Sequence, residues 1–277
     1  MLSKNTIESY LADIKSFIKW FEENNGQFQP EKVIPFDIKK FIDQYNLKPS
    51  TKNRRIASIS ALFDFFISKR IVLMNPVSSV RNIKISKINL DKQWLSIREQ
   101  NQLLYEIEKE KNEFLRLRDM AMIRTMLNCG LRLSEVRHLK IQDVDLIAGT
   151  ITIRHGKGEK YRVQTIATEK KYTFHAMSEW NQLRPNVDSS YLFVSLRGKQ
   201  MSDRVIQTTV QKYANRAGLG NVSPHQLRHS CGKNLINAGY PIEFVAEMLG
   251  HESIETTRRY ITPAKNEIEK AASEIEQ

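Results

Sequence analysis

Cysteine, glycine and long hydrophobic runs are scarce in this sequence of 277 residues. The two cysteines, Cys129 and Cys231, cannot form a framework of several disulfides, and both lie in apolar helical contexts, so we expect reduced core residues. No run of about 18 apolar residues occurs, so no transmembrane helix is predicted. The N-terminus, MLSKN, lacks the pattern of a signal peptide. We therefore expect a cytoplasmic protein without a membrane partner.

Acidic residues are outnumbered by basic residues in both parts of the chain. Lys and Arg number 43 and Asp and Glu 31, which gives a formal net charge of +12 and an isoelectric point near 9.6. Residues 1–90 hold 15 of the basic and 8 of the acidic residues. Two basic parts fit a polyanion held from two sides, because each neutralised phosphate releases counterions. A basic protein with solvated lysines remains the alternative interpretation of the charge alone.

The most informative stretch lies near the C-terminus. Ser223, Pro224 and Gln226 predict a helix start with a hydroxyl cap, a proline in the first turn and a capping-box partner. His225 and Arg228 stand three residues apart, so they share a face beside the partially positive end of that helix. This corner suits a phosphate.

Two more helices are expected downstream. One covers residues 242–249 and leaves His251 in the loop just past its end. Ser253 is expected to cap the other, which carries Tyr260 in its last turn. Three helix ends thus bring together four candidate side chains: His225, Arg228, His251 and Tyr260.

The pattern His-x-x-Arg, Leu-Gly-His and a tyrosine nine residues later resembles the tyrosine recombinases, or phage integrase family, which include the Xer proteins. The resemblance implies an upstream arginine in a Gly-Leu-Arg-x-Ser-Glu turn, and Arg132 stands in the matching segment GLRLSE, residues 130–135. It also implies a lysine in a hairpin, and Lys157 stands in HGKGEK, residues 155–160. The resemblance covers roughly residues 94–263.

In that family the tyrosine attacks a DNA phosphodiester, so the resemblance implies that Tyr260 is the nucleophile. It implies that Arg132 and Arg228 clamp the scissile phosphate, a task that suits planar, always-charged guanidiniums better than lysine. Lys157 is the implied general acid for the departing 5′ oxygen and is preferred to its neighbour Lys160.

The remaining matches have supporting roles. The resemblance implies that His225 assists proton transfer and hydrogen-bonds the phosphate, and that His251 positions the phosphate and the tyrosine. Glu135 matches the acidic residue that follows the first arginine, and we expect it to orient that arginine or to cap its helix. Lys160 and Arg162 are candidates for DNA phosphate contacts.

The implied reaction gives a 3′-phosphotyrosyl link and a free 5′ hydroxyl. Because one ester replaces another, joining needs neither ATP nor a metal, and no cofactor is expected. The segment around Lys157 agrees, since Gly158 follows it where a phosphate-binding P-loop has Ser or Thr. The expected function is therefore site-specific recombination of double-stranded DNA.

Three different functions compete with this one. His225 and His229 stand four apart, as in zinc metalloprotease helices, but Gln226 replaces the general-base glutamate and the cation Arg228 would lie close to the metal; His229 is interpreted as a surface or packing residue. A catalytically silent DNA-binding accessory factor on the same fold and a type IB topoisomerase also remain open.

The periodicity predicts a mainly α chain with a small antiparallel β-sheet and two domains. The N-terminal part is expected to resemble the helical core-binding domain of the family. The expected divisions are residues 1–81 for that domain, 82–92 for a basic linker, 93–263 for the catalytic domain and 264–277 for a C-terminal helix.

Within the N-terminal domain we expect helices over residues 3–24, around 36–45, and for about 20 residues after a Ser50 cap. The first is expected to bury a stripe of Ile7, Leu11, Ile14, Ile18 and Phe21. The third carries polar side chains in its first turns that are candidate DNA contacts: Lys52, Asn53, Arg54 and Arg55.

In the catalytic domain we expect helices over residues 95–109 and 115–128, a helix capped by Ser134, and two more over 170–182 and 202–217. Residues 150–154 and 161–166 alternate apolar and polar side chains and are expected to pair as a hairpin with Lys157 at its tip.

The tail has apolar residues at helical spacing but is too short to be stable alone. The resemblance implies that it docks into a neighbouring protomer of a homotetramer on paired core sites; packing in cis is the alternative. The biological role remains open among Xer-like dimer or cointegrate resolution, transposition and mobile-element integration, with or without a second recombinase or an accessory protein. A nucleoid association is expected.

Overall fold

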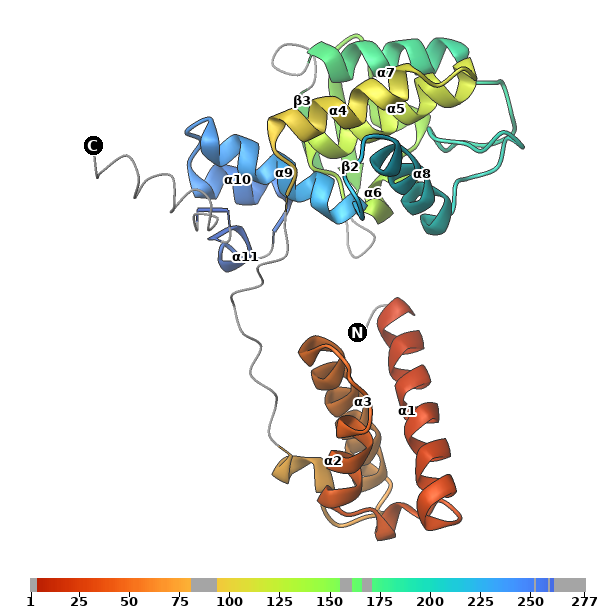
Figure 1. Ribbon diagram of the computed structural model, residues 1–277, viewed down its shortest axis with the longest axis vertical. Coiled ribbons are helices and arrows are strands. Elements are labelled where there is room, and N and C mark those ends of the chain that lie inside the picture. Colours follow the sequence, from red (N-terminus) through yellow and green to blue (C-terminus); the bar gives the residue numbers. More distant parts are fainter. Residues whose placement is uncertain are drawn as a thin grey trace. The chain divides into compact units, whose positions relative to one another are not determined.

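The computed structural model describes residues 4–80, 94–154, 161–165, 171–251, 253–258 and 260–261. The chain divides into two compact units, residues 1–89 and 90–277, which are described separately. Both are mainly helical, and the second contains a three-stranded antiparallel sheet (Figure 1). The predicted fold class is therefore confirmed. The predicted linker, residues 82–92, and the C-terminal helix, 264–277, lie outside the described residues.

The first unit is built from α1 (Lys4–Asn25), α2 (Pro35–Asp43) and α3 (Pro49–Ser68), with 3₁₀ turns at Pro30–Lys32 and Pro76–Ser79. Prolines open α2 and α3, where the missing N–H would be unpaired in any case. The core is aromatic, with Phe17, Phe41 and Phe63 fully buried. Rings of Phe17 and Phe41 meet edge-on at 5.3 Å, which joins α1 to α2.

The buried face of α1 differs from the predicted stripe. Ile7 and Leu11 are 44% and 50% exposed, whereas Asp13 is buried. Asp13 is tolerated there because Arg54 lies 2.5 Å and Arg55 3.7 Å from its carboxylate. Ion pairs with two arginines of α3 therefore allow α1 to bury a face that differs from the one that apolar spacing alone predicts.

The second unit contains the helices α4 (Ile97–Glu108), α5 (Glu113–Cys129), α6 (Leu133–His138), α7 (Lys171–Leu183), α8 (Asp203–Arg216), α9 (Pro224–Asn237), α10 (Ile242–Leu249) and α11 (Glu255–Arg258), and a 3₁₀ turn at Ile141–Asp143. Helix α5 is buried along most of its length and packs against α4, α7 and α9. The described helices include none that is long and apolar enough to cross a bilayer.

The sheet has the order β1 (Val144–Asp145), β2 (Thr150–Arg154), β3 (Tyr161–Thr165). The predicted hairpin is confirmed, and its last described pair is Arg154 with Tyr161. Its tip, residues 155–160, lies outside the described residues, and with it Lys157 and Lys160. Strand β3 of the hairpin lies beside the end of α10, where Gln164 donates a hydrogen bond to the carbonyl of Met248.

Helix ends in the two units match the sequence signals closely, with three corrections. Helix α3 begins at Pro49 rather than after a Ser50 cap, and α6 begins at Leu133 with Arg132, not Ser134, at the N-cap position. Helix α11 ends at Arg258, so Tyr260 lies in the turn after it instead of in its last turn. Each correction moves an end by one or two residues.

Candidate active site

A left-handed glycine positions the first arginine. Gly130 ends α5 with φ of 62°, Leu131 is fully buried, and Arg132 then occupies the N-cap position of α6. The backbone N–H of Arg132 donates to Glu135 Oε2 at 2.7 Å, and its Nη1 donates to Oε1 at 2.8 Å. Its Nη2 donates to the carbonyl of Gly250. The Arg132 side chain remains 36% exposed.

Glu135 is the buried anion that organises this cluster. Arg162, on β3, donates from Nη1 and Nη2 to the two carboxylate oxygens, both at 2.9 Å, and from Nε to the Met248 carbonyl at 3.0 Å. Burial alone would raise the pKa of Glu135, but the hydrogen bonds and charges of Arg162 and Arg132 outweigh it and lower that pKa to about 2. Glu135 is therefore ionised at neutral pH.

Arg228 lies deeper in the same cluster. It donates from Nη1 to the carbonyl of Gly130 and from Nη2 to that of Leu249, at 2.5 and 2.6 Å, and lies 3.9 Å from Glu135. Burial lowers its pKa to about 10, and the charge of Arg132 acts in the same direction. It still carries its charge at neutral pH. The side chain thus ties the C-terminal ends of α5 and α10 to α9.

Three guanidiniums surround one carboxylate, so the cluster of Arg132, Arg162, Arg228 and Glu135 carries a net positive charge. A partly buried site of this charge attracts an anion more strongly than exposed arginines do, because the dielectric screening is weaker. Planar guanidiniums suit the oxygens of a phosphate in particular. The cluster can therefore bind a phosphodiester.

Three hydrogen-bonded side chains form a chain beside this cluster: His225 and His229 of α9, and Tyr260 in the turn after α11. His229 Nδ1 lies 2.7 Å from the Tyr260 hydroxyl, and His229 Nε2 lies 2.6 Å from His225 Nε2. Arg228 and His229 are consecutive, so the cationic cluster and this chain meet at one turn of the helix. Sequence reasoning missed His229 as a site residue, although its spacing of four from His225 was visible.

Several side chains pack around the ring of Tyr260. It is fully buried with Cys231, Val245 and Leu249, and its carbonyl accepts from Lys233 Nζ at 3.4 Å. The His251 ring stacks nearly parallel to it, with centroids 6.3 Å apart. His251 Nδ1 shares a hydrogen bond of 2.8 Å with Thr257 Oγ1, which fixes the imidazole.

The structure therefore brings together five of the six predicted catalytic residues: Arg132, His225, Arg228, His251 and Tyr260. Glu135 is the anion shared by the two arginines among them. The sixth, Lys157, and the candidate DNA contact Lys160 lie outside the described residues. Arg162, predicted as a DNA contact, lies inside the cluster with its side chain 11% exposed.

The candidate DNA contacts of α3 are engaged within the first unit. Lys52 pairs with Asp43 at 3.1 Å, and Arg54 with Asp13 at 2.5 Å. Arg55 lies over the rings of Phe41 and Tyr45, with its Cζ atom 4.9 and 5.2 Å from the centroids. Asn53 is half-buried. These contacts give α3 a packing role that the basic pattern did not predict.

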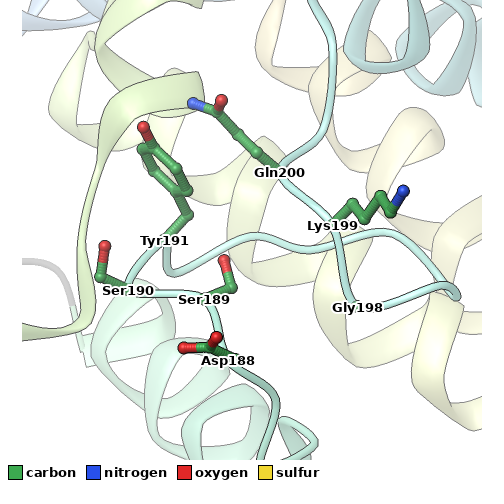
Figure 2. A pocket seen from close by; sticks show the side chains of 7 residues that line it. All are labelled: Asp188, Ser189, Ser190, Tyr191, Gly198, Lys199 and Gln200. Atoms are coloured by element: carbon green, nitrogen blue, oxygen red, sulfur yellow. The ribbon is translucent and has the colours of Figure 1, made fainter.

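A separate hollow lies in the segment between α7 and α8. Figure 2 shows the side chains that line it: Asp188, Ser189, Ser190, Tyr191, Gly198, Lys199 and Gln200. None of the candidate catalytic residues is among them. Within the described part of the chain, no three His, Cys, Asp or Glu side chains are grouped to hold a metal ion. His225 and His229, the alternative zinc pair, are hydrogen-bonded to each other.

Comparison with known proteins agrees with this geometry. Residues 93–267 match the phage integrase family, and residues 1–70 match the phage integrase N-terminal SAM-like domain. Tyrosine recombinase XerC of Thermodesulfovibrio yellowstonii is 30% identical over 93% of this chain and 85% of its own length. A tyrosine recombinase of Agathobacter rectalis is 31% identical over 94% of this chain and 86% of its own length.

A solved structure of the XerH site-specific recombinase, bound to a palindromic difH substrate as a post-cleavage complex, is similar with a TM-score of 0.79 and 26% identity. The match covers 98% of this chain and 80% of XerH. With a family match over more than half of its residues and relatives at about 30% identity along nearly its whole length, this chain belongs to the phage integrase family.

Proposed function

We propose that this protein is a site-specific DNA recombinase that cleaves and rejoins strands through a 3′-phosphotyrosyl intermediate, with Tyr260 as the nucleophile. The observation that carries the proposal is the meeting of the cationic cluster and the Tyr260–His229–His225 chain at one turn of α9. A phosphate-binding site beside a tyrosine hydroxyl is what attack on a phosphodiester requires. The XerC and XerH relatives support the same reaction class.

The cluster would supply the electrostatic part of catalysis. Attack on phosphorus builds negative charge on the two non-bridging oxygens, which Arg132 and Arg228 would bind. Their hydrogen bonds to the Gly250, Gly130 and Leu249 carbonyls fix both guanidiniums before DNA arrives, so little reorganisation is needed. Loss of one such donor is expected to lower the rate by about 100-fold.

Glu135 and Arg162 would act through the arginines. The carboxylate holds Arg132 by two hydrogen bonds, and Arg162 in turn holds both carboxylate oxygens. Without Arg162, the carboxylate would be free to take a second contact with Arg132 or Arg228 and compete with the phosphate. We assign Glu135 and Arg162 as positioning residues. For Arg162 this role replaces the contact with DNA phosphate that the sequence predicted.

The remaining assignments extend this proposal. Lys157, on the hairpin tip, would protonate the 5′ oxygen as it leaves, and His251 would fix the nucleophile from the side opposite His229. The basic first unit would grip duplex DNA together with the second through the linker of residues 82–92. Residues 264–277 would exchange between protomers of a tetramer that holds two core sites, in a protein associated with the nucleoid.

Covalent selection tests the proposed function and identifies the target site in the same experiment. The wild-type protein is incubated in EDTA with duplexes that carry a randomised core, and DNA that stays attached to protein in detergent is sequenced. The proposal predicts enrichment of a site with inverted repeats by the wild type and none by Tyr260→Phe. Equal recovery with both proteins would refute Tyr260 as the nucleophile.

A further inference from the structure

A fully buried hydroxyl must lose its proton before it can attack, and Tyr260 has no exposed surface through which water could accept that proton directly. The unperturbed pKa of a tyrosine is about 10, so the phenol is protonated at neutral pH. A proton acceptor inside the protein is therefore needed. The atom that the structure places at hydrogen-bonding distance is Nδ1 of His229, at 2.7 Å.

The second nitrogen of His229 continues the path. Nε2 lies 2.6 Å from Nε2 of His225, and the two imidazoles stand four residues apart on α9. Burial decreases along this line, because Tyr260 is 0% and His229 5% exposed, whereas His225 is exposed on the first turn of the helix. The three side chains thus lead from a buried hydroxyl to solvent.

We propose that His229 is a catalytic proton relay, a role that rests on the proposed function of Tyr260 as nucleophile. In the starting state Tyr260 donates its O–H to His229 Nδ1, and His229 Nε2–H donates to His225 Nε2. As the phenol oxygen forms its bond to phosphorus, its proton passes to Nδ1, and the proton on Nε2 of His229 passes to His225. His229 ends neutral with its proton on Nδ1, and His225 carries one additional proton that it can release to solvent.

Two other side chains that can carry a proton, His251 and Lys233, lie near Tyr260 and make different contacts. His251 Nδ1 shares a hydrogen bond with Thr257 Oγ1, and its ring lies at 23° to the Tyr260 ring with centroids 6.3 Å apart. Lys233 Nζ lies 3.4 Å from the Tyr260 carbonyl oxygen. The His229 ring meets the Tyr260 ring edge-on, at 63° with centroids 5.5 Å apart, and its Nδ1 lies 2.7 Å from the phenol oxygen.

The test uses a substrate that isolates the nucleophile side of the reaction. A duplex core site carries sulfur in place of the bridging 5′ oxygen, so that the leaving thiolate needs no general acid and cannot rejoin. The rate of covalent adduct formation is measured for wild type and His229→Ala. The relay predicts a loss of about 100-fold or more, in the range expected for a missing general base.

Two controls separate this loss from misfolding. His175→Ala removes an exposed histidine of α7 that pairs only at the surface with Glu179, and it is expected to react at the wild-type rate. His229→Ala is compared with wild type in thermal unfolding and in binding to the uncleaved site. Wild-type binding with slow attack locates the defect in the chemical step.

Two replacements distinguish proton transfer from positioning. Asn at position 229 can hold the phenol oxygen with its amide but cannot take a proton, so the relay predicts that His229→Asn is as slow as His229→Ala. A fluorinated tyrosine at position 260 is more acidic and partly ionised without a base. The relay predicts that this residue restores most of the rate lost in His229→Ala.

Each outcome decides the proposal. If wild type forms no Tyr260-dependent adduct, the proposed function and the relay both fall. If wild type reacts and His229→Ala reacts equally fast, the relay alone fails. The relay would also be overturned if His229→Asn reacted at the wild-type rate, or if the fluorinated tyrosine did not restore the rate of His229→Ala. His229 would then have a positioning role at most.

Discussion

The ring of Tyr260 lies so close to α9 that a Cβ atom on Gly232 would stand 2.5 Å from Cε2 and 2.7 Å from Cζ. Gly232 is helical, and its φ is not in the left-handed region, so its backbone does not require glycine. Space for the nucleophile is the physical reason for a glycine here. The residue costs about 0.5–1 kcal/mol of helix stability relative to alanine.

Gly232→Ala is therefore expected to displace Tyr260 from His229 and to slow covalent attachment to DNA. A displacement of about 1 Å at a reacting atom can cost roughly 100-fold in rate. The measurement is adduct formation on a suicide substrate, compared with Asn237→Ala, which adds helix propensity at an exposed position of α9. A wild-type rate for Gly232→Ala would show that the ring position is not critical.

Glu135→Gln is expected to lower the free energy of unfolding by about 3 kcal/mol at pH 7, because the pKa of Glu135 falls from 4.5 to about 2 on folding. Three guanidiniums would also lose their shared anion. Glu255→Gln is the matched control, since the Glu255–Arg258 pair is exposed and contributes little. Denaturant unfolding measures both; a variant of Glu135 as stable as the control would contradict the role of the buried anion.

The same pKa shift has a defined pH dependence. A folded-state pKa below the unfolded value means that the stabilisation is fully present above about pH 4.5 and is lost as the pH falls toward 2. The stability difference between wild type and Glu135→Gln should therefore narrow over that interval. A difference that stayed constant from pH 5 to the lowest pH that permits measurement would argue against ionised Glu135 as its source.

Arg162→Lys tests the positioning of Arg132 through Glu135. Lysine keeps the charge but loses the two-point contact with the carboxylate and the bond to the Met248 carbonyl. We expect adduct formation to slow by about 10-fold, equivalent to about 1.4 kcal/mol. Arg154→Lys is the control, because Arg154 lies on β2 of the same hairpin and its side chain, paired with Asp143, is 60% exposed. Equal rates for the two variants would remove Arg162 from the catalytic account.

Arg55 distinguishes packing from DNA contact in the first unit. Its guanidinium lies over Phe41 and Tyr45 and 3.7 Å from buried Asp13, so Arg55→Ala is expected to destabilise the α1–α3 unit by about 1–2 kcal/mol. Hydrogen exchange in α3 of the full chain measures this, with exposed Lys19→Ala as control. Arg55 would instead be a phosphate contact if Arg55→Ala left hydrogen exchange unchanged and reduced the slope of log binding constant against log salt concentration by about one.

Local signals in the sequence predicted most of the second unit. Ser223 and Gln226 do form a capping box at the start of α9, with Pro224 in its first turn, and Gly130 and Gly250 do end α5 and α10 with positive φ. These features depend on neighbours within one turn. The site residues at helix ends could therefore be located before the fold was known.

Contacts between distant segments could not be predicted in this way. His229 was interpreted as a packing residue because its partner Tyr260 lies 31 positions away on another element. Arg162 was predicted to contact DNA from its basic surroundings, which gave no sign of its contact with Glu135, 27 positions earlier. The burial of Asp13, outside the predicted apolar stripe, could not be predicted for the same reason, since its partners Arg54 and Arg55 lie on α3.

The most direct measurement of the central claim is the chemistry of the cleaved end. A duplex carrying the selected site, nicked near the cleavage position, is incubated in EDTA with wild type and with Tyr260→Phe, and the linked peptide and the DNA ends are identified. We predict Tyr260 joined to a 3′ phosphate and a free 5′ hydroxyl with wild type, and no adduct with Tyr260→Phe. Attachment at a 5′ end, attachment through another residue, or occupied DNA without any adduct would contradict the account.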